Sequence, residues 1–285
     1  MTPEKFRYFA PRTVDEALAL LSEHGERAKI LAGGQSLLAA MKLRLASPEV
    51  LIDLGQIRDL DYIRRTSSGL SVGAMTPYVK LLRSALVADV CSLVAQAAKV
   101  IGDVQIRNRG TIGGTIAHAD PSADMPAAVL AIDAKVVVRG PEGERVVPAP
   151  EFFISTFTTA LEPDEIVTEV RLPSLAGWRS TYLKAARRPS DFAMVAVAAV
   201  ARLDAGGTRL DDVKIALSGV SDSVFRATSV ENAVRGRLVS ELDFDRAAAG
   251  VTEGRFVLAD VHASSAYRAQ LAVTQVSRAM SLVVG

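Results

Sequence analysis

The sequence of 285 residues predicts an α+β fold made of three consecutive units. Short apolar runs typical of strands alternate with helical patterns as far as residue 172. Proline and glycine then break the pattern at Pro173–Gly177, and strands followed by helices fill the remaining chain. We therefore expect units at residues 1–57, 58–175 and 178–285, and the 49% of residues that are apolar suffice for their cores.

The first unit is expected to begin with a capped helix. Thr13 and Glu16 have capping-box spacing, so each side chain can satisfy an exposed backbone donor of the other residue. Leucines then recur at helical spacing until Gly25 ends the helix. A strand, a helical stretch and a second strand are expected at residues 29–31, 38–43 and 50–54.

The second unit is expected to contain three strands, at residues 70–73, 134–139 and 166–172. Thr76 and Pro77 fit the N-cap and first position of a helix, and an alanine-rich helix is expected at residues 89–100. Gly102–Thr115 is expected to be irregular, and Pro141–Gly143 to form a turn.

The third unit is expected to form a small antiparallel sheet, with strands at residues 180–186, 193–203 and 213–218. Gly206 and Gly207 predict a hairpin turn between the last two strands. A final helix is expected from about Ser264, and its buried face would carry Val273, Val276, Met280 and Val283.

Composition excludes several classes of function. Lys and Arg total 33 against 32 for Asp and Glu, so the charge gives no case for a nucleic-acid or membrane-surface partner. The single cysteine, Cys91, excludes an intramolecular disulfide and any Cys-ligated cluster on this chain. The first residues lack the apolar stretch of a secretory signal, and the longest apolar run, Phe192–Ala201, is too short to span a membrane. We expect a cytoplasmic protein with no integral membrane segment.

Two glycine pairs carry the strongest functional pattern. They lie in Ala32–Ser36, after an expected strand, and in Thr111–Thr115, after a basic segment with Arg107 and Arg109. Adjacent glycines let backbone N–H groups converge and a phosphate approach closely, and nearby hydroxyls add donors. Each pair could instead be a simple tight turn, and the arginines could be solvated. Neither pair fits a Rossmann or P-loop motif.

Acid–base and metal chemistry have little support. His118, Asp120 and Asp124 lack metal-ligand spacing, and no nucleophile motif accompanies them, so we expect no catalytic and no metal-binding residues. Asp124 is suited to accept hydrogen bonds from ribityl or ribose hydroxyls, or alternatively to cap the helix that begins at Met125. Cys91 is expected to be a core residue. Lys184 is expected to be a surface charge, because its strand has the pattern of an exposed strand.

Taken together, these segments resemble the flavin-binding medium subunit of the molybdenum hydroxylases, the family of carbon monoxide and xanthine dehydrogenases. The resemblance rests on Leu31–Ser36, Leu51–Leu54, Gln105–Gly114 and Ala117–Asp124, followed by Phe152-Phe153, Arg187-Arg188 and Asp191–Ala193. It implies a vanillyl-alcohol-oxidase-type (PCMH-like) FAD-binding fold of two α/β subdomains with a C-terminal α+β domain. Some relatives carry histidine where this chain has Gln35, which can still donate a hydrogen bond.

The resemblance also implies which residues bind FAD. The glycine segments would hold the pyrophosphate, Asp124 and Lys184 would lie at the flavin, and Ile101, Val167 and Phe192 would supply apolar contacts near the ring. The full set that it implies is Leu31, Ala32, Gly33, Gly34, Gln35, Ser36, Ile101, Thr111, Ile112, Gly113, Gly114, Thr115, Ala117, Asp120, Asp124, Val167, Lys184 and Phe192.

The implied activity is electron transfer within a larger enzyme. Substrate would be hydroxylated at a molybdenum cofactor on a large partner subunit, and electrons would pass through [2Fe-2S] clusters of a small iron–sulfur partner to FAD on this chain. A dimer of heterotrimers is the implied assembly. Two alternatives stay open: a stand-alone FAD-dependent oxidoreductase of the same fold, and a non-catalytic nucleotide-binding assembly subunit.

Overall fold

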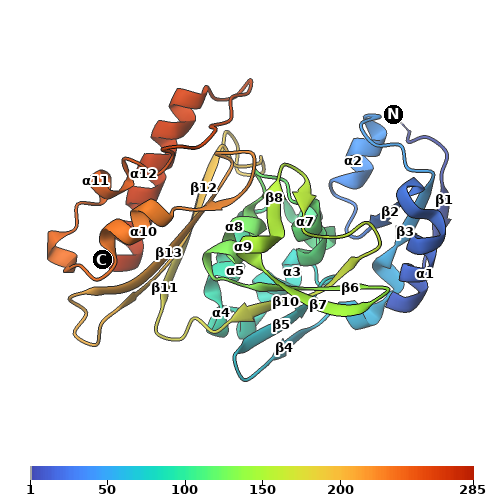
Figure 1. The fold of residues 1–285 in the computed structure, drawn as a ribbon, viewed down its shortest axis with the longest axis horizontal. Helices are drawn as coiled ribbons and strands as arrows, with labels where there is room; N and C mark the ends of the chain where they lie inside the picture. The colour runs from blue at the N-terminus through green and yellow to red at the C-terminus, as the bar shows by residue number, and fades with distance from the viewer. Residues whose placement is uncertain (1) are drawn as a thin grey trace.

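The computed structural model describes residues 2–285, so Met1, the first residue of the expected first unit, lies outside the described residues. Three main sheets, of three, five and four strands, follow one another along the chain, and their units lie in a row from the N-terminal to the C-terminal side (Figure 1). Within residues 2–285 no helix has the length and apolar character needed to cross a membrane.

The N-terminal sheet is parallel and has the strand order β1-β3-β2. Its strands are β1 (Arg7–Phe9), β2 (Ala28–Leu31) and β3 (Val50–Asp53), joined through α1 (Val14–His24) and α2 (Leu37–Lys42), with short 3₁₀ turns at Gly25–Arg27, Leu54–Gln56 and Arg58–Leu60. The expected strands and helices are present. Strand β1 was not expected, because it is short and mostly exposed and is defined by its pairing with β3.

The expected capping box forms in part. Thr13 Oγ1 accepts a hydrogen bond from the Glu16 N–H at 3.1 Å. The Glu16 carboxylate, however, accepts from the N–H of Arg12 at 2.7 Å, one residue before the cap. The backbone donors at this helix start are therefore shared between two side chains, as the sequence predicts, with a shift of one residue in one partner.

The middle sheet is antiparallel, with strand order β4-β5-β10-β6-β7. Its strands are β4 (Ile63–Arg65), β5 (Gly69–Gly73), β6 (Lys135–Gly140), β7 (Gly143–Pro148) and β10 (Ile166–Pro173). The helices beside it are α3 (Tyr78–Arg83), α4 (Ala85–Val90), α5 (Ser92–Val100), α6 (Val104–Arg109), α7 (Ile112–His118), α8 (Asp124–Ala131) and α9 (Ala149–Phe152), and a small hairpin pairs β8 (Phe153–Ser155) with β9 (Thr158–Thr159).

Three expectations for this unit are wrong. The helix expected at 89–100 is broken at Cys91, whose non-helical backbone ends α4 and precedes α5. Gly102–Thr115 is not irregular, because Asp103 and Thr111 each cap a short helix. Thr76 is not an N-cap: its buried hydroxyl is hydrogen bonded to the backbone of Tyr62, and Pro77 occupies the cap position of α3.

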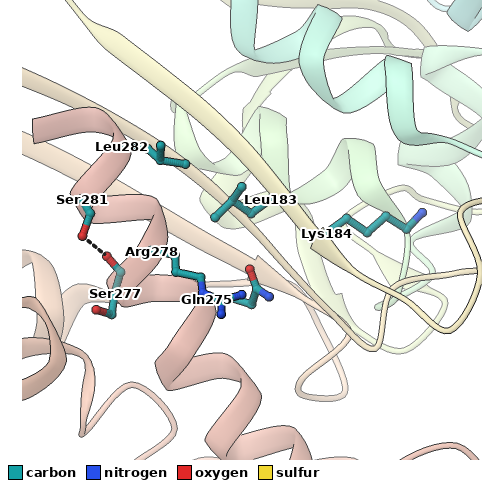
Figure 2. A pocket seen from close by; sticks show the side chains of 7 residues that line it. All are labelled: Leu183, Lys184, Gln275, Ser277, Arg278, Ser281 and Leu282. Atoms are coloured by element: carbon teal, nitrogen blue, oxygen red, sulfur yellow. Dashed lines mark hydrogen bonds between the residues drawn. The ribbon is translucent and has the colours of Figure 1, made fainter. Parts of the chain in front are cut away.

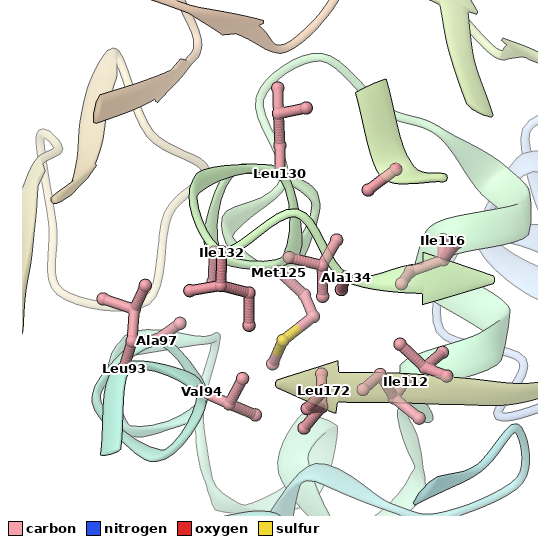
Figure 3. Packing of buried hydrophobic residues seen from close by; sticks show 14 of the residues in the cluster. Leu93, Val94, Ala97, Ile112, Ile116, Met125, Leu130, Ile132, Ala134 and Leu172 are labelled. Atoms are coloured by element: carbon pink, nitrogen blue, oxygen red, sulfur yellow. The ribbon is translucent and has the colours of Figure 1, made fainter. Parts of the chain in front are cut away.

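The core of the middle unit lies between the sheet and its helices. Met125 of α8 points into the space between Leu93 and Val94 of α5 and Leu172 of β10 (Figure 3). All four side chains are nearly or completely buried. Because apolar burial of this kind is the main favourable term in folding, this packing fixes α8 and the residue that begins it, Asp124.

The third unit is an antiparallel sheet of order β11-β12-β13-β14. Its elements are β11 (Arg179–Ala185), β12 (Val195–Leu203), β13 (Leu210–Ser218), β14 (Phe225–Arg226), α10 (Thr228–Val234), a 3₁₀ turn at Val239–Glu241, α11 (Phe244–Ala248) and α12 (Ser265–Val284). The expected final helix is confirmed, with Ser264 as its cap.

Both faces of the third sheet are covered. Helix α12 packs on β11 and β12 from one side, while α5 and α8 of the middle unit pack on β11, β12 and β13 from the other (Figure 1). Strand β12 is therefore buried on both faces from Val195 to Ala201, which explains why its sequence is a continuous apolar run. The same packing brings β11 and its Lys184 against the middle unit.

Candidate functional site

The two glycine segments, far apart in the sequence, lie against each other. A Cβ added to Gly33 would come within 2.1 Å of the Arg109 carbonyl oxygen, and one added to Gly114 would lie 3.1 Å from the Ala32 Cβ. Gly33 is therefore required by the close approach of Ala32–Ser36 to the Arg109–Gly110 backbone. The fold joins the two predicted segments into one surface.

The first segment, Ala32–Ser36, presents unused backbone donors. Gly34 has a φ of +76°, a left-handed conformation that glycine adopts without strain. No acceptor within residues 2–285 takes the N–H groups of Gly33, Gly34, Gln35 or Ser36. Consecutive N–H groups around a left-handed residue form a concavity that suits an anion. The arrangement fits the predicted pyrophosphate contact.

The second segment, Thr111–Thr115, is the first turn of α7 rather than a loop or a tight turn. Thr111 caps this helix by accepting the Gly114 N–H at 3.1 Å. The N–H groups of Ile112 and Gly113 are taken by the carbonyls of Thr76 and Ala74. These donors are engaged inside the protein, so this segment contributes a small-residue surface instead of free N–H groups.

Gly113 has a packing role. A Cβ at this position would lie 2.4 Å from the Ala74 Cβ, which no side chain could tolerate. Ile112 is fully buried in the core beside it. The two glycines of α7 thus have different roles. Gly113 lets the helix pack onto Ala74, and Gly114 faces Ala32 of the first segment.

A buried ion pair joins α8 of the middle unit to β11 of the third unit. Lys184 Nζ lies 2.8 Å from Asp124 Oδ2, and the two side chains are 6% and 5% exposed. The Tyr182 hydroxyl donates to Asp124 Oδ1 at 2.8 Å. Burial raises the pKa of the Asp124 carboxyl, while Lys184 and Tyr182 act in the opposite direction. Lys184 is therefore not the surface charge that its strand suggested, and Asp124 begins α8 without being its cap.

The same lysine contacts the residue before Ile101, which is the predicted ring-contacting residue. Lys184 Nζ donates to the Val100 carbonyl at 3.2 Å. Arg107 then fixes the following turn, since its Nη1 donates to the carbonyls of Ile101 and Gly102 at 2.9 and 3.0 Å. Arg107 thus holds this turn through its Nη1 and is not simply the solvated arginine that the sequence allowed. Ile101, Asp124 and Lys184 are brought together.

Sequence reasoning missed two residues that build this end of the site, Tyr182 and Gln96. Tyr182 and Lys184 are two residues apart on β11, so their side chains share a face of the strand. This two-residue repeat was the feature of the sequence from which Tyr182 could have been identified. Gln96 of α5 accepts the Tyr182 N–H at 3.0 Å and donates to Ser180 Oγ at 3.0 Å. Nothing local in the sequence indicated that α5 packs on β11.

Two of the remaining predicted residues, Asp120 and Phe192, are linked to the turn before Asp124. Asp120 accepts the Ser122 N–H at 2.8 Å and so shapes the turn before Asp124. Phe192 is 59% exposed, and the N–H of the next residue, Ala193, donates to the Ser122 carbonyl at 3.4 Å. Leu31 and Val167 are buried and Ala117 is exposed on α7.

A hollow of about 560 Å³ adjoins the same strand but belongs to its other face. It is lined by Leu183, Lys184, Gln275, Ser277, Arg278, Ser281 and Leu282. Figure 2 shows the Lys184 side chain directed away from α12, whereas Leu183 points toward it. The Lys184 ammonium therefore serves the Asp124 side of β11. No three His, Cys, Asp or Glu side chains in the described part of the chain could together hold a metal ion.

Comparison with known proteins gives two family matches. The family described as FAD binding domain in molybdopterin dehydrogenase matches residues 4–175. The family described as CO dehydrogenase flavoprotein C-terminal domain matches residues 180–283.

Individual relatives match nearly the whole chain. The carbon monoxide dehydrogenase medium chain of Hydrogenophaga pseudoflava is 40% identical over 99% of this chain and 98% of its own. The glyceraldehyde dehydrogenase medium chain of Sulfolobus acidocaldarius is 38% identical over 85% of both chains. A solved structure of carbon monoxide dehydrogenase from Hydrogenophaga pseudoflava, in a form that lacks the Mo-pyranopterin moiety, superimposes with a TM-score of 0.96 at 41% identity, covering 99% of this chain and 98% of that one.

Proposed function

The chain belongs to the family of FAD-binding medium subunits of molybdenum hydroxylases, and we propose that it passes electrons from iron–sulfur clusters of a partner subunit through FAD to an external acceptor. It is an oxidoreductase flavoprotein subunit with a PCMH-like FAD-binding fold. The observation that carries the proposal is the meeting of the two glycine segments beside a set of free backbone donors.

We infer that the free N–H groups of Gly33–Ser36 hold the FAD pyrophosphate. The four groups have no acceptor within residues 2–285, and their anion-suited concavity matches the charge of a diphosphate. Gly114 and Ala32 would line the approach, because larger side chains there would fill the space between the segments. Thr111 would keep the α7 turn in place through its cap.

The buried pair would fix the flavin end. Lys184 and Asp124 are already satisfied by each other, by Val100 and by Tyr182, so they form a rigid support that excludes water. Ile101 and Phe192 would contribute apolar contacts next to this support. FAD, when bound, would supply the exchange of single electrons with an iron–sulfur partner and of electron pairs with an acceptor.

The single cysteine cannot by itself hold an iron–sulfur cluster, so the proposed electron transfer needs a partner subunit. A [2Fe-2S] cluster takes four ligands, commonly four cysteines, and this chain has one cysteine. We propose a small iron–sulfur subunit as electron donor and a large subunit with the molybdenum cofactor, assembled as a dimer of heterotrimers in the cytoplasm.

We also propose the division of this chain into units at residues 1–57, 58–175 and 178–285.

Purification of the native complex tests this proposal. We expect the chain to co-purify with a cysteine-rich chain and a molybdenum-bearing chain, and to carry FAD. FAD in this chain should be reduced by substrate only when the iron–sulfur partner is present. Turnover by the isolated flavoprotein would favour a stand-alone oxidoreductase instead, and a colourless chain that FAD cannot reconstitute would indicate an assembly subunit.

A further inference from the structure

A buried arginine, Arg268, is hydrogen bonded to the segment that follows Phe192. Arg268 lies in the first turns of α12 and is 2% exposed. Its Nη1 donates to the Met194 and Gly219 carbonyls, both at 2.6 Å. Its Nε donates to the Leu258 carbonyl at 3.2 Å and its Nη2 to Asp260 Oδ2 at 2.7 Å. Four of the five guanidinium donors are therefore used inside the third unit.

The two carbonyls that share Nη1 belong to segments that already touch. Gly219 has a φ of +79°, and a Cβ there would lie 2.7 Å from the carbonyl oxygens of both Ala193 and Met194. Carbonyl oxygens crowded together repel one another, and the cation between them offsets that repulsion. Arg268 therefore holds the start of β12 and the end of β13 in one arrangement.

Both segments that Arg268 contacts are also hydrogen bonded to the turn before Asp124, in the candidate flavin site. The Gly219 N–H donates to the Pro121 carbonyl at 2.7 Å, and the Ala193 N–H donates to the Ser122 carbonyl at 3.4 Å. Pro121 and Ser122 lie three and two residues before Asp124, the partner of Lys184. A continuous set of hydrogen bonds thus runs from Arg268 to the turn before α8.

We propose that Arg268 is a positioning residue for the flavin site, and this inference rests on the proposed function. Through Met194 and Gly219 it sets where the Phe192 segment lies relative to Asp124 and Lys184. Lysine cannot replace it, because an ammonium is a single point charge and cannot span two carbonyls, a third carbonyl and a carboxylate in one plane. Arg268 itself need not touch FAD.

The test uses the full chain loaded with FAD and three variants of this network. Arg268→Lys keeps the charge and loses the planar donors, Gly219→Ala disturbs the gripped carbonyls, and Asp260→Asn is the mildest change because Asp260 is about half exposed. Val283→Ala is the matched control, since Val283 lies on the same helix in the core of the third unit and contacts no residue of the network through a hydrogen bond.

We expect Arg268→Lys and Gly219→Ala to raise the Kd for FAD about tenfold and to change the visible circular dichroism of the flavin. Asp260→Asn should change both in the same direction by less. Val283→Ala should lower Tm and leave both unchanged. The inference is overturned if the network variants lose stability like Val283→Ala but keep the parental Kd and spectrum. Failure of the unmodified chain to bind FAD would instead overturn the proposed function together with this inference.

Discussion

Lys184 and Asp124 show at the scale of single residues how tertiary packing can bury a side chain that the local sequence predicts to be exposed. Lys184 lies in a sequence that predicts exposure, yet its side chain is 6% exposed and bonded to Asp124 and Val100. Sequence reasoning from local pattern could not find this, because the covering helices α5 and α8 come from residues some 60 to 90 positions earlier. The resemblance in motifs, by contrast, singled out both residues.

Breaking this pair should be costly. Lys184→Met leaves the Asp124 carboxylate buried without its cation, and we expect a loss of about 3–5 kcal/mol in the free energy of unfolding. Burial already raises the pKa of Asp124, and loss of Lys184 raises it further. A carboxyl with a raised pKa in the folded state favours folding when protonated, so the loss should grow as pH rises above about 4.

Urea unfolding at pH 5 and pH 8 measures the effect of Lys184→Met. The double variant Lys184→Met/Asp124→Asn removes the unpaired charge and should recover part of the stability. An equal loss at both pH values, with no recovery in the double variant, would contradict a buried charge pair.

Cys91 should be inert. Burial raises the pKa of its thiol to about 12, so the reactive thiolate is scarce at neutral pH. We expect a thiol reagent to label Cys91 only after unfolding, and Cys91→Ser to keep its full FAD content. Rapid labelling of the native protein, or loss of FAD from a folded Cys91→Ser variant, would assign the residue a role beyond packing.

At the scale of elements, strands and helices with a clear apolar pattern were predicted well, and exposed strands and helix α7 were predicted poorly. Strands β2, β3, β5, β10 and β13 and helix α12 lie close to their expected bounds. Strands β1, β4 and β7 are mostly exposed and depend on their neighbours, so local patterns did not mark them. Helix α7 was missed because its glycines have low helix propensity, which the Thr111 cap and tertiary packing override.

Two helix caps of the same chemistry provide a matched comparison. Thr13 caps α1 and Thr111 caps α7, each by accepting one N–H at 3.1 Å. We expect Thr13→Ala and Thr111→Ala each to cost about 1 kcal/mol in the free energy of unfolding. Only Thr111→Ala should also weaken FAD binding, because α7 lies against the first glycine segment. Equal FAD affinities in the two variants, measured by titration, would remove Thr111 from the site.

At the scale of the whole molecule, the proposed site combines residues from the three proposed units. The first supplies the free donors, the middle supplies α7 and Asp124, and the third supplies Lys184 and the segment of Phe192. The order of these residues along the chain could be read from the sequence. Their contacts could not, since they depend on packing between sheets.

The molecule should lose stability in mild acid. Burial lowers the pKa of His118, whose ring lies against that of Phe157 in a tilted arrangement, with 4.8 Å between ring centroids. A histidine with a lowered pKa in the folded state favours the unfolded state as pH falls below about 6.5. We expect Tm to fall from pH 7.5 to pH 5.5, and to fall less in His118→Gln. An identical decline in both proteins would show that other groups cause it.

The measurement closest to the central claim is titration of the full chain, freed of flavin, with FAD. A Cβ at Gly114 would lie 2.8 Å from Thr111 Oγ1 and 3.1 Å from the Ala32 Cβ, so Gly114→Val fills the space between the glycine segments. At Gly206 the nearest atom to an added Cβ is 3.7 Å away, and Gly206→Ala is the control. We predict that Gly114→Val weakens FAD binding at least about tenfold while Gly206→Ala does not. A folded Gly114→Val chain with unchanged affinity would contradict the assignment of this site.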